Sequence, residues 1–306
     1  MTLRLGTRGS ALALAQSRTV AQALTDATGE IVELVEIVTP GDRSSAPVQQ
    51  LGIGVFVSAL REALHAKEID FAVHSYKDLP TAPADGLTVA AVPGREDPRD
   101  ALITRDGQLL AELAPGTRIG TGALRRIAQL NALGRGLQCV PIRGNVDTRL
   151  RKVAEGDLDA VVLAAAGLRR LGRAAEITEV LDPMLMLPAP AQGALAVECS
   201  TTSEGLVEML ASLDDEQTRA AVTAERALLA TLEAGCSAPV AALADVAEND
   251  AGEWEIYLRG AVLSPDGSVA VRLSGTGMLT DAAGVGRRLA AELLAEGGET
   301  VLGVHE

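Results

Sequence analysis

Short apolar runs and stretches of helical spacing follow one another from the start of the chain. Residues 3–6 predict a strand, and residues 11 to about 27 place apolar side chains at helical spacing. Between them, Gly9 permits a sharp turn and Ser10 is a good N-cap. Backbone N–H groups and the positive end of the helix then point at this turn, which suits an anion.

The same strand, turn and helix recur at residues 118–122 and 123–133. A helix-like stretch also leads into an apolar strand twice, at residues 69–73 and at residues 158–162. Alternation of this kind is typical of α/β domains with mostly parallel sheets, whose ligands bind at the carboxyl ends of the strands. We therefore expect an α/β fold with two related lobes and a cleft between them.

Two segments that contain proline and glycine, residues 94–99 and 187–193, predict crossovers between the lobes. After about residue 215 the pattern becomes that of a smaller α+β domain with an antiparallel sheet, with elements expected at residues 217–233, 255–262, 269–274 and 282–296. The expected first lobe, second lobe and C-terminal domain are residues 1–94 with 194–214, residues 99–187 and residues 216–306.

Composition excludes several classes of function. The 306 residues include five aromatic side chains, too few for a platform that stacks nucleic-acid bases, and the pI near 4.8 disfavours DNA and RNA. The longest apolar run, residues 160–168, is far too short for a bilayer, and the first residues show no export signal. Three cysteines far apart form neither a disulfide framework nor a metal site. We expect a cytoplasmic monomer without nucleic-acid, membrane or metal partners.

Positive charge is concentrated in one stretch of an acidic chain. The formal net charge is −14, yet residues 118–173 carry ten Arg and one Lys against four acidic residues, a balance of +7. The last 106 residues show the reverse, with six Arg against 18 acidic residues. Because the Arg guanidinium group binds carboxylates and phosphates through paired hydrogen bonds, the basic stretch predicts an anionic ligand.

Polar side chains, among them His74, Ser75, Lys77 and Asp78, follow directly after the predicted strand at residues 69–73. An open α/β sheet places functional groups at this end of a strand, and a lone carboxylate among cations stabilises a positive intermediate. No second acid lies nearby, so paired carboxylates have little support. The alternative is structural: Lys77 and Asp78 form a solvated pair, and His74 is a satisfied residue at the strand end.

Arg125 and Arg126 occupy the first turns of a predicted helix, and Arg143 and Arg149 lie around the start of another. A cation near a helix N-terminus is unfavourable for the helix dipole, so this placement indicates a bound anion. The alternative is that Arg126 and Arg149 pair on the surface with nearby acidic side chains, namely Asp147, Glu155 or Asp157.

Cys236 lies between Gly and Ser in a predicted loop, where its sulfur could be reached and alkylated. Cys139 and Cys199 lie in apolar, strand-like runs, and we interpret them as small buried hydrophobic residues. The same interpretation is the alternative for Cys236.

Six motifs follow one another at residues 6–10, 73–80, 95–101, 124–126, 143–145 and 232–236. In this order they resemble the porphobilinogen deaminase, or hydroxymethylbilane synthase, family, over residues 3 to about 245. The resemblance implies two lobes like those of periplasmic binding proteins and a third domain that carries a reactive cysteine. Cys236 would hold a dipyrromethane cofactor through a thioether. Four porphobilinogen units would be added head to tail, and hydrolysis would release hydroxymethylbilane for haem biosynthesis.

The resemblance also implies roles for single residues. Asp78 matches the catalytic aspartate, which stabilises positive charge on the pyrrole nitrogens as each unit loses ammonia. Every pyrrole bears an acetate and a propionate, so basic and hydroxyl side chains would hold a growing set of carboxylates. Cofactor binding is implied for Lys77, Thr121, Arg125, Arg126, Arg143 and Gly144, and substrate binding for Arg8, Ser10, Ser75, Arg149 and Gln192.

The chain departs from the family pattern in two places. Many members have two Ser where this chain has Gly122 and Ala123, and the segment before Phe56 often carries Lys, whereas residues 49–54 have none. The alternative function is a two-lobed carboxylate- or phosphate-binding protein without catalysis, which gives Cys236 no role. A phosphate-handling enzyme ranks third, because the sequence shows no Gly-rich phosphate loop and no acidic metal cluster.

Overall fold

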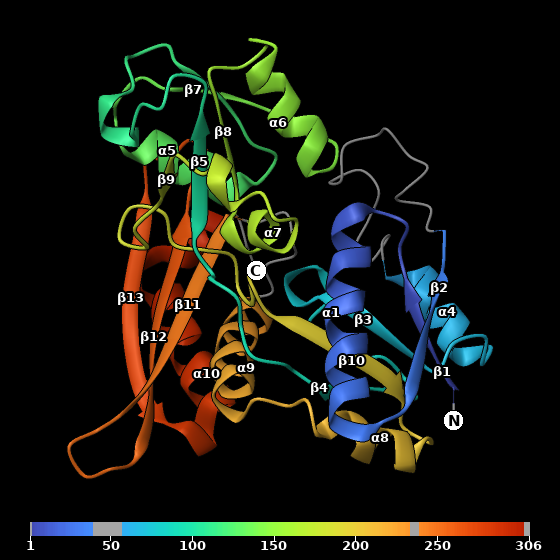
Figure 1. The fold of residues 1–306 in the computed structure, drawn as a ribbon. Helices are drawn as coiled ribbons and strands as arrows, with labels where there is room; N and C mark the ends of the chain where they lie inside the picture. The colour runs from blue at the N-terminus through green and yellow to red at the C-terminus, as the bar shows by residue number, and fades with distance from the viewer. Residues whose placement is uncertain (1, 39–56, 233–238, 303–306) are drawn as a thin grey trace. The chain divides into compact units, whose positions relative to one another are not determined.

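The computed structural model describes residues 2–38, 57–232 and 239–302, which divide into two compact units (Figure 1). Unit 1 comprises residues 1–96 and 194–219, and unit 2 comprises residues 97–193 and 220–306. The chain passes from one unit to the other within the two segments that the prolines and glycines mark, and a third time within helix α9 (Glu216–Thr231).

Unit 1 is a five-stranded sheet with helices on both faces. Its order is β2-β1-β3-β10-β4, and β10 runs against the other four strands. Helices α1 and α8 pack on one face through an apolar cluster, and α4 packs on the other. The strands are β1 (Thr2–Thr7), β2 (Ile31–Glu36), β3 (Phe71–Ser75), β4 (Leu87–Ala91) and β10 (Leu195–Ser200), and the helices are α1 (Ala11–Thr28), α4 (Ser58–His65) and α8 (Glu204–Ala211).

The first part of unit 2 repeats this topology. Its sheet has the order β7-β6-β8-β5-β9, with β5 antiparallel to both neighbours, so β5 takes the place that β10 has in unit 1. The prediction of two related α/β lobes is therefore confirmed, and in each sheet one strand is reversed. The strands are β5 (Asp100–Thr104), β6 (Arg118–Gly120), β7 (Gln138–Val140), β8 (Ala160–Ala164) and β9 (Glu179–Val180), and the helices are α5 (Leu124–Ala132), α6 (Val146–Ala154) and α7 (Ala165–Arg170).

The last part of unit 2 is an antiparallel sheet with helices against one face, as the change of pattern predicts. Strands β11 (Val240–Glu248), β12 (Trp254–Leu263) and β13 (Ala270–Met278) pack on α9 and α10 (Ala282–Leu293), and α11 (Glu299–Leu302) ends the described chain. Gly286 lets α10 approach α9 closely, because a Cβ atom there would lie 2.2 Å from the Ala224 carbonyl oxygen. The opposite face of the sheet packs on α5 through Ala128.

Several local predictions are confirmed, and several strands, β11 among them, are new. Ser10 caps α1, since its Oγ accepts a hydrogen bond from the Ala13 N–H at 3.3 Å. Cys199 is buried in β10 as predicted, whereas Cys139 in β7 is only partly buried, so the prediction of a buried residue is wrong there; both are free thiols. The sequence pattern did not predict β11. Among the described helices, none has the length and apolar character needed to cross a membrane.

Candidate functional site

Asp78 lies at the carboxyl end of β3, in a short 3₁₀ turn formed by residues 76–78. Its side chain is exposed, and Lys77 beside it is half-buried. The chain turns here because β3 ends at Ser75 and the Leu79 N–H bonds to the Tyr76 carbonyl oxygen. The predicted position of Asp78 at a strand end is therefore confirmed.

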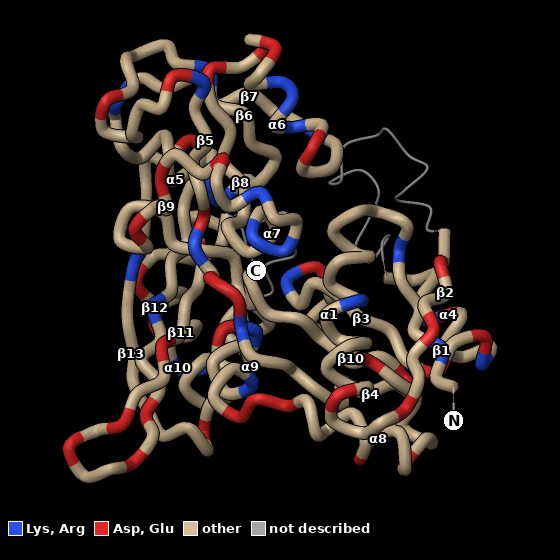
Figure 2. The backbone as a smooth tube through the Cα atoms, in the orientation of Figure 1, with Lys and Arg blue, Asp and Glu red and all other residues tan. Residues whose placement is uncertain are grey.

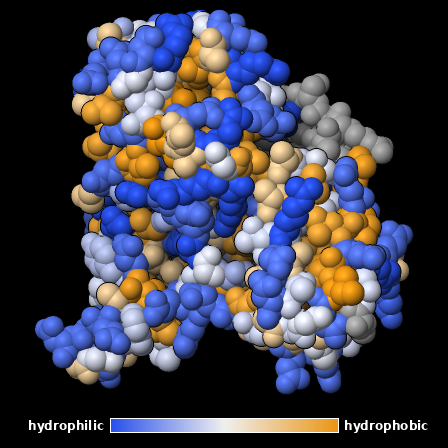
Figure 3. Space-filling view, viewed as in Figure 1, coloured by the Kyte–Doolittle hydropathy of each residue, from blue (hydrophilic) through white to orange (hydrophobic). Residues whose placement is uncertain are grey.

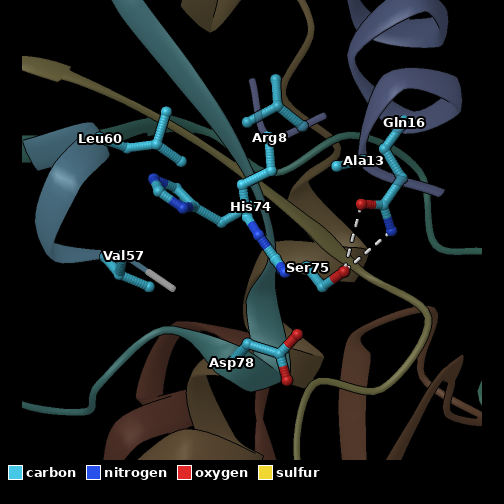
Figure 4. A pocket seen from close by; sticks show the side chains of 9 residues that line it. Arg8, Ala13, Gln16, Val57, Leu60, His74, Ser75 and Asp78 are labelled. Carbon is cyan, nitrogen blue, oxygen red and sulfur yellow. Dashed lines mark hydrogen bonds between the residues drawn. The ribbon is translucent and has the colours of Figure 1, made fainter. Parts of the chain in front are cut away.

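A pocket in unit 1 brings Asp78 together with side chains from other elements (Figure 4). Arg8 reaches it from the turn between β1 and α1, which opens at the same sheet edge because β1 and β3 are parallel. Val57 and Leu60 provide an apolar wall. The polar lining residues are Arg8, Gln16, His74, Ser75 and Asp78. One cation, one carboxylate and a hydroxyl group thus share a partly apolar pocket, which suits an organic molecule that carries both an acidic group and positive charge.

Gln16 is a site residue that the sequence analysis missed. Its Nε2 donates to Ser75 Oγ at 2.9 Å, and Ser75 Oγ donates to Gln16 Oε1 at 3.2 Å. Gln16 is buried on the inner face of α1, where apolar side chains such as Val20 and Leu24 predominate. A glutamine among the apolar positions on the buried face of this helix was the sequence signal that could have identified it.

A buried charged cluster lies behind the same pocket. Glu198 on β10 accepts hydrogen bonds from Arg61 Nε and Nη2, and His74 Nε2 lies 3.2 Å from Glu198 Oε2 without the alignment of a hydrogen bond. Burial acts to raise the pKa of Glu198, but His74 and Arg61 outweigh it and hold the pKa below its usual value. His74 is thus a buried residue at the strand end, but the alternative that it is a satisfied one is wrong, because its Nε2 has no hydrogen-bond partner among the described residues.

In unit 2, Arg125 and Arg126 surround one carboxylate. Arg125 Nη1 donates to Asp100 Oδ2 at 2.6 Å, and Arg126 Nη2 donates to Asp100 Oδ1 at 2.7 Å. Asp100 is fully buried, and each arginine is 5% exposed. The alternative that Arg126 pairs with an acidic side chain on the surface is therefore wrong, because its partner is the buried Asp100 carboxylate of β5. The sequence analysis did not single out Asp100, although an acid that begins an apolar strand is unusual.

Gln192 joins the same network. Its Nε2 donates to Asp100 Oδ1 at 2.9 Å, and its Oε1 accepts from Arg125 Nη2 at 3.1 Å. Thr121, which the resemblance implies in cofactor binding, is buried at the end of β6, where its Oγ1 accepts from the Ala123 N–H at 3.3 Å. The Thr121 hydroxyl group is thus engaged by the backbone just before α5, which begins without a side-chain cap.

Arg143, Gly144 and Arg149 lie around the N-terminus of α6. Arg149 Nε donates to the Gly144 carbonyl oxygen at 2.9 Å, and Gly144 has a φ of +104° that favours glycine. Arg143 Nη1 is buried and has no hydrogen-bond partner among the described residues. The acids proposed as surface partners form other pairs: Asp147 with Arg173, Glu155 with Arg151 and Asp157 with Lys152.

Basic residues gather on α6 and α7 of unit 2, which Figure 2 shows in blue. The space-filling view is hydrophilic over α7 (Figure 3). The +7 stretch of sequence therefore folds into one lobe. Cys236 and the Lys-free segment at residues 49–54 lie outside the described residues.

Comparison with known proteins decides the family. The model "Porphobilinogen deaminase, dipyromethane cofactor binding domain" matches residues 3–208, and the model of the C-terminal domain matches residues 219–295. The chain belongs to the porphobilinogen deaminase family. A porphobilinogen deaminase from Nocardia farcinica is 59% identical over 98% of this chain and 88% of its own length. One from Mycobacterium tuberculosis is 57% identical over 98% of both chains.

A solved structure from Coxiella burnetii, a periplasmic substrate-binding protein of an ABC transporter, is also similar. The match covers 69% of this chain and 91% of that chain, with a TM-score of 0.44 and 12% identity. At this level the likeness adds nothing to the family assignment, which depends on the sequence matches above.

The first family model names a dipyromethane cofactor, and the chemistry of Arg143 in unit 2 is compatible with such a group. A dipyrromethane made from this family's substrate carries carboxylates, and the unpartnered Arg143 Nη1 is a buried donor that lacks an acceptor within the described chain. Among the same residues, no group of three or more His, Cys, Asp or Glu side chains could hold a metal ion.

Proposed function

We propose that Asp78 is the catalytic residue of a transferase that joins four porphobilinogen molecules head to tail and releases hydroxymethylbilane. The carrying observation is that the exposed Asp78 carboxylate shares one pocket with Arg8 and Ser75. In each addition the C–N bond of the aminomethyl group breaks and ammonia leaves; the free α-carbon of the terminal pyrrole then forms a C–C bond to the aminomethyl carbon, and its C–H bond breaks with loss of the proton to solvent. The carboxylate stabilises the positive charge that develops on the pyrrole nitrogens during these steps.

Cys236 carries the dipyrromethane through a thioether in this proposal. When bound, that group supplies the first pyrrole carbon to which substrate is joined. Arg143 and Arg149 hold its carboxylates and those of the added units, and the buried Arg143 Nη1 supports this role. Lys77, Thr121, Gly144, Arg125 and Arg126 complete the proposed cofactor-binding set.

Arg8, Ser10, Ser75, Arg149 and Gln192 are the proposed substrate-binding residues. Arg8 and Ser75 are supported by their place in the Asp78 pocket. Ser10 is occupied as the N-cap of α1, so its contribution to substrate binding comes through the shape of this turn. Gln192 is held by Asp100 and Arg125, and it acts on the substrate through them.

The working form that we propose is a cytoplasmic monomer with a first lobe, a second lobe and a C-terminal domain that carries the cofactor loop. The net charge of −14 disfavours nucleic acid and anionic membranes as partners. Light scattering of the purified protein tests the monomer. A carboxylate- or phosphate-binding protein without catalysis is not favoured, since the family match covers both the cofactor-binding and the C-terminal domain.

Intact-mass spectrometry tests the function directly. The purified protein should carry an adduct of two pyrrole units that is absent in Cys236→Ser. Limiting porphobilinogen should then produce a ladder of further pyrrole additions. An unmodified chain that consumes no porphobilinogen would overturn the proposal.

A further inference from the structure

Asp100, which does not line the Asp78 pocket, is a buried carboxylate that accepts five hydrogen bonds from side chains. It is the first residue of β5 and has no exposed surface. Its Oδ2 accepts from Arg125 Nη1, and its Oδ1 accepts from Arg125 Nη2 at 3.0 Å, Arg126 Nε at 3.1 Å, Arg126 Nη2 at 2.7 Å and Gln192 Nε2 at 2.9 Å. Five donors thus converge on one side chain, and they fix both guanidinium planes.

The remaining contacts of the two arginines are neutral. Arg125 Nη1 also donates to the Leu187 carbonyl oxygen at 3.0 Å, and Arg126 Nη1 donates to the Val162 carbonyl oxygen at 2.9 Å. The two guanidinium groups and the one carboxylate sum to a formal charge of +1, and all three side chains are almost completely shielded from solvent. Burying an unbalanced charge is costly, and apolar side chains of similar volume would be a cheaper way to stabilise the fold.

Two of the three segments that join the units, residues 94–99 and 187–193, are attached to this cluster from within unit 2. Gln192 Nε2 donates to the Pro98 carbonyl oxygen at 2.8 Å, so the two connecting segments are tied to each other. Gln129 on α5 holds Leu187 through two hydrogen bonds, of 3.0 and 2.9 Å. The orientation of Arg125 and Arg126 therefore depends on groups that are 25 to 67 residues distant in sequence.

We propose that Asp100 is a positioning residue of this transferase: its carboxylate presets the guanidinium groups of Arg125 and Arg126, and the one positive charge that it leaves uncompensated attracts a carboxylate arm of the bound pyrrole chain. Asp100 itself touches no substrate. The inference rests on the proposed function, because the ligand carboxylate is that of the substrate or the cofactor.

Three variants separate positioning from bulk charge. Asp100→Asn keeps the shape and raises the cluster to +2. The double variant Asp100→Asn with Arg126→Gln restores +1 but removes the fixed orientation. Asp100→Glu keeps the charge and displaces the carboxylate by one methylene. Asp97→Asn is the matched control, since Asp97 lies in the same segment and pairs with Arg99 and Arg169, whose side chains are exposed; within residues 57–232 no hydrogen bond joins it to Asp100.

We expect the double variant and Asp100→Glu to melt cooperatively and to carry less of the two-pyrrole adduct in intact-mass spectra. Their KM for porphobilinogen should rise about ten-fold, which corresponds to about 1.4 kcal/mol of binding free energy. The kcat should fall by a smaller factor than the KM rises. The control Asp97→Asn should match the parent in melting, in the amount of adduct, in KM and in kcat.

Recovery of parental KM and adduct in the double variant would overturn positioning in favour of charge balance alone. A parental KM in Asp100→Glu would overturn it even if both Asn variants failed to fold. These failures differ from failure of the proposed function, which would appear in the unsubstituted protein as the absence of any adduct or turnover.

Discussion

Gln16 and Ser75 exchange two hydrogen bonds, of 2.9 and 3.2 Å, across the pocket that contains Asp78. Gln16→Leu keeps the volume but removes both bonds, so the Ser75 hydroxyl group loses its fixed orientation. We expect a KM for porphobilinogen raised several-fold and a loss of about 1 kcal/mol in unfolding free energy. Steady-state kinetics and urea unfolding measure the two effects. Gln22→Leu, on the exposed face of the same helix, should change neither.

The carboxylate of Asp78 is exposed, so its removal should affect chemistry and not folding. Asp78→Asn should slow the release of ammonia by at least about 100-fold, since a group that stabilises transition-state charge contributes on that scale. Thermal unfolding should stay within about 0.5 kcal/mol of the parent. Asp78→Glu should retain part of the rate because it keeps the charge. Equal activity in Asp78→Asn and the parent would exclude the catalytic role.

Arg143 offers a contrast between stability and binding. Its Nη1 is buried without a partner among the described residues, so Arg143→Gln removes an unsatisfied donor and should leave the unfolding free energy unchanged or raise it. The same variant should lose carboxylate binding and accumulate incomplete pyrrole adducts, visible by mass spectrometry. Uniform loss of activity with no trapped species would contradict the role of Arg143 in holding the growing chain.

The sequence predicted the anion at Arg125 and Arg126 but not its source. Two cations at the start of a helix indicate a negative partner, and the structure provides one in Asp100, 25 residues upstream of Arg125. Local sequence cannot distinguish an internal carboxylate from a ligand. Strand β5 lies near the start of α5 only because the sheet places it two strands away from β6, which precedes α5, and this order is not visible in the sequence. The resemblance to the family identified the arginines, and only the folded chain shows what holds them.

The two lobes were predictable because the same succession of strand, turn and helix occurs twice along the sequence. Strand β11 was missed since its residues, Val240–Glu248, are rich in alanine, which indicates helix as readily as strand. It forms a strand because pairing with β12 buries its first half against α9 and α5. Tertiary packing overrides local preference here.

Buried charge at Glu198 should make stability depend on pH. Its pKa is lowered below the ordinary value of 4.5, so its contribution is present above pH 4.5 and is lost as the pH falls through the lower, folded-state value. Glu198→Gln leaves Arg61 and His74 without their anion and should cost about 3 kcal/mol near neutral pH. The gap between parent and variant in urea unfolding should shrink at about pH 3. A gap that stays constant or widens in acid would contradict the assigned pairing.

Counting reactive thiols tests the proposed attachment of the cofactor to Cys236 without any assay of turnover. Burial and the neighbouring Glu198 raise the pKa of Cys199 to about 11, so Cys199 in the native protein should resist alkylation near pH 8, where thiolate is scarce. In denaturant, a chain with its cofactor should present two reactive thiols, Cys139 and Cys199, because the thioether blocks Cys236. Cys236→Ser should also present two, whereas a chain that never acquired the cofactor should present three. Three reactive thiols in a denatured protein that still carries the two-pyrrole mass would place the attachment on another residue.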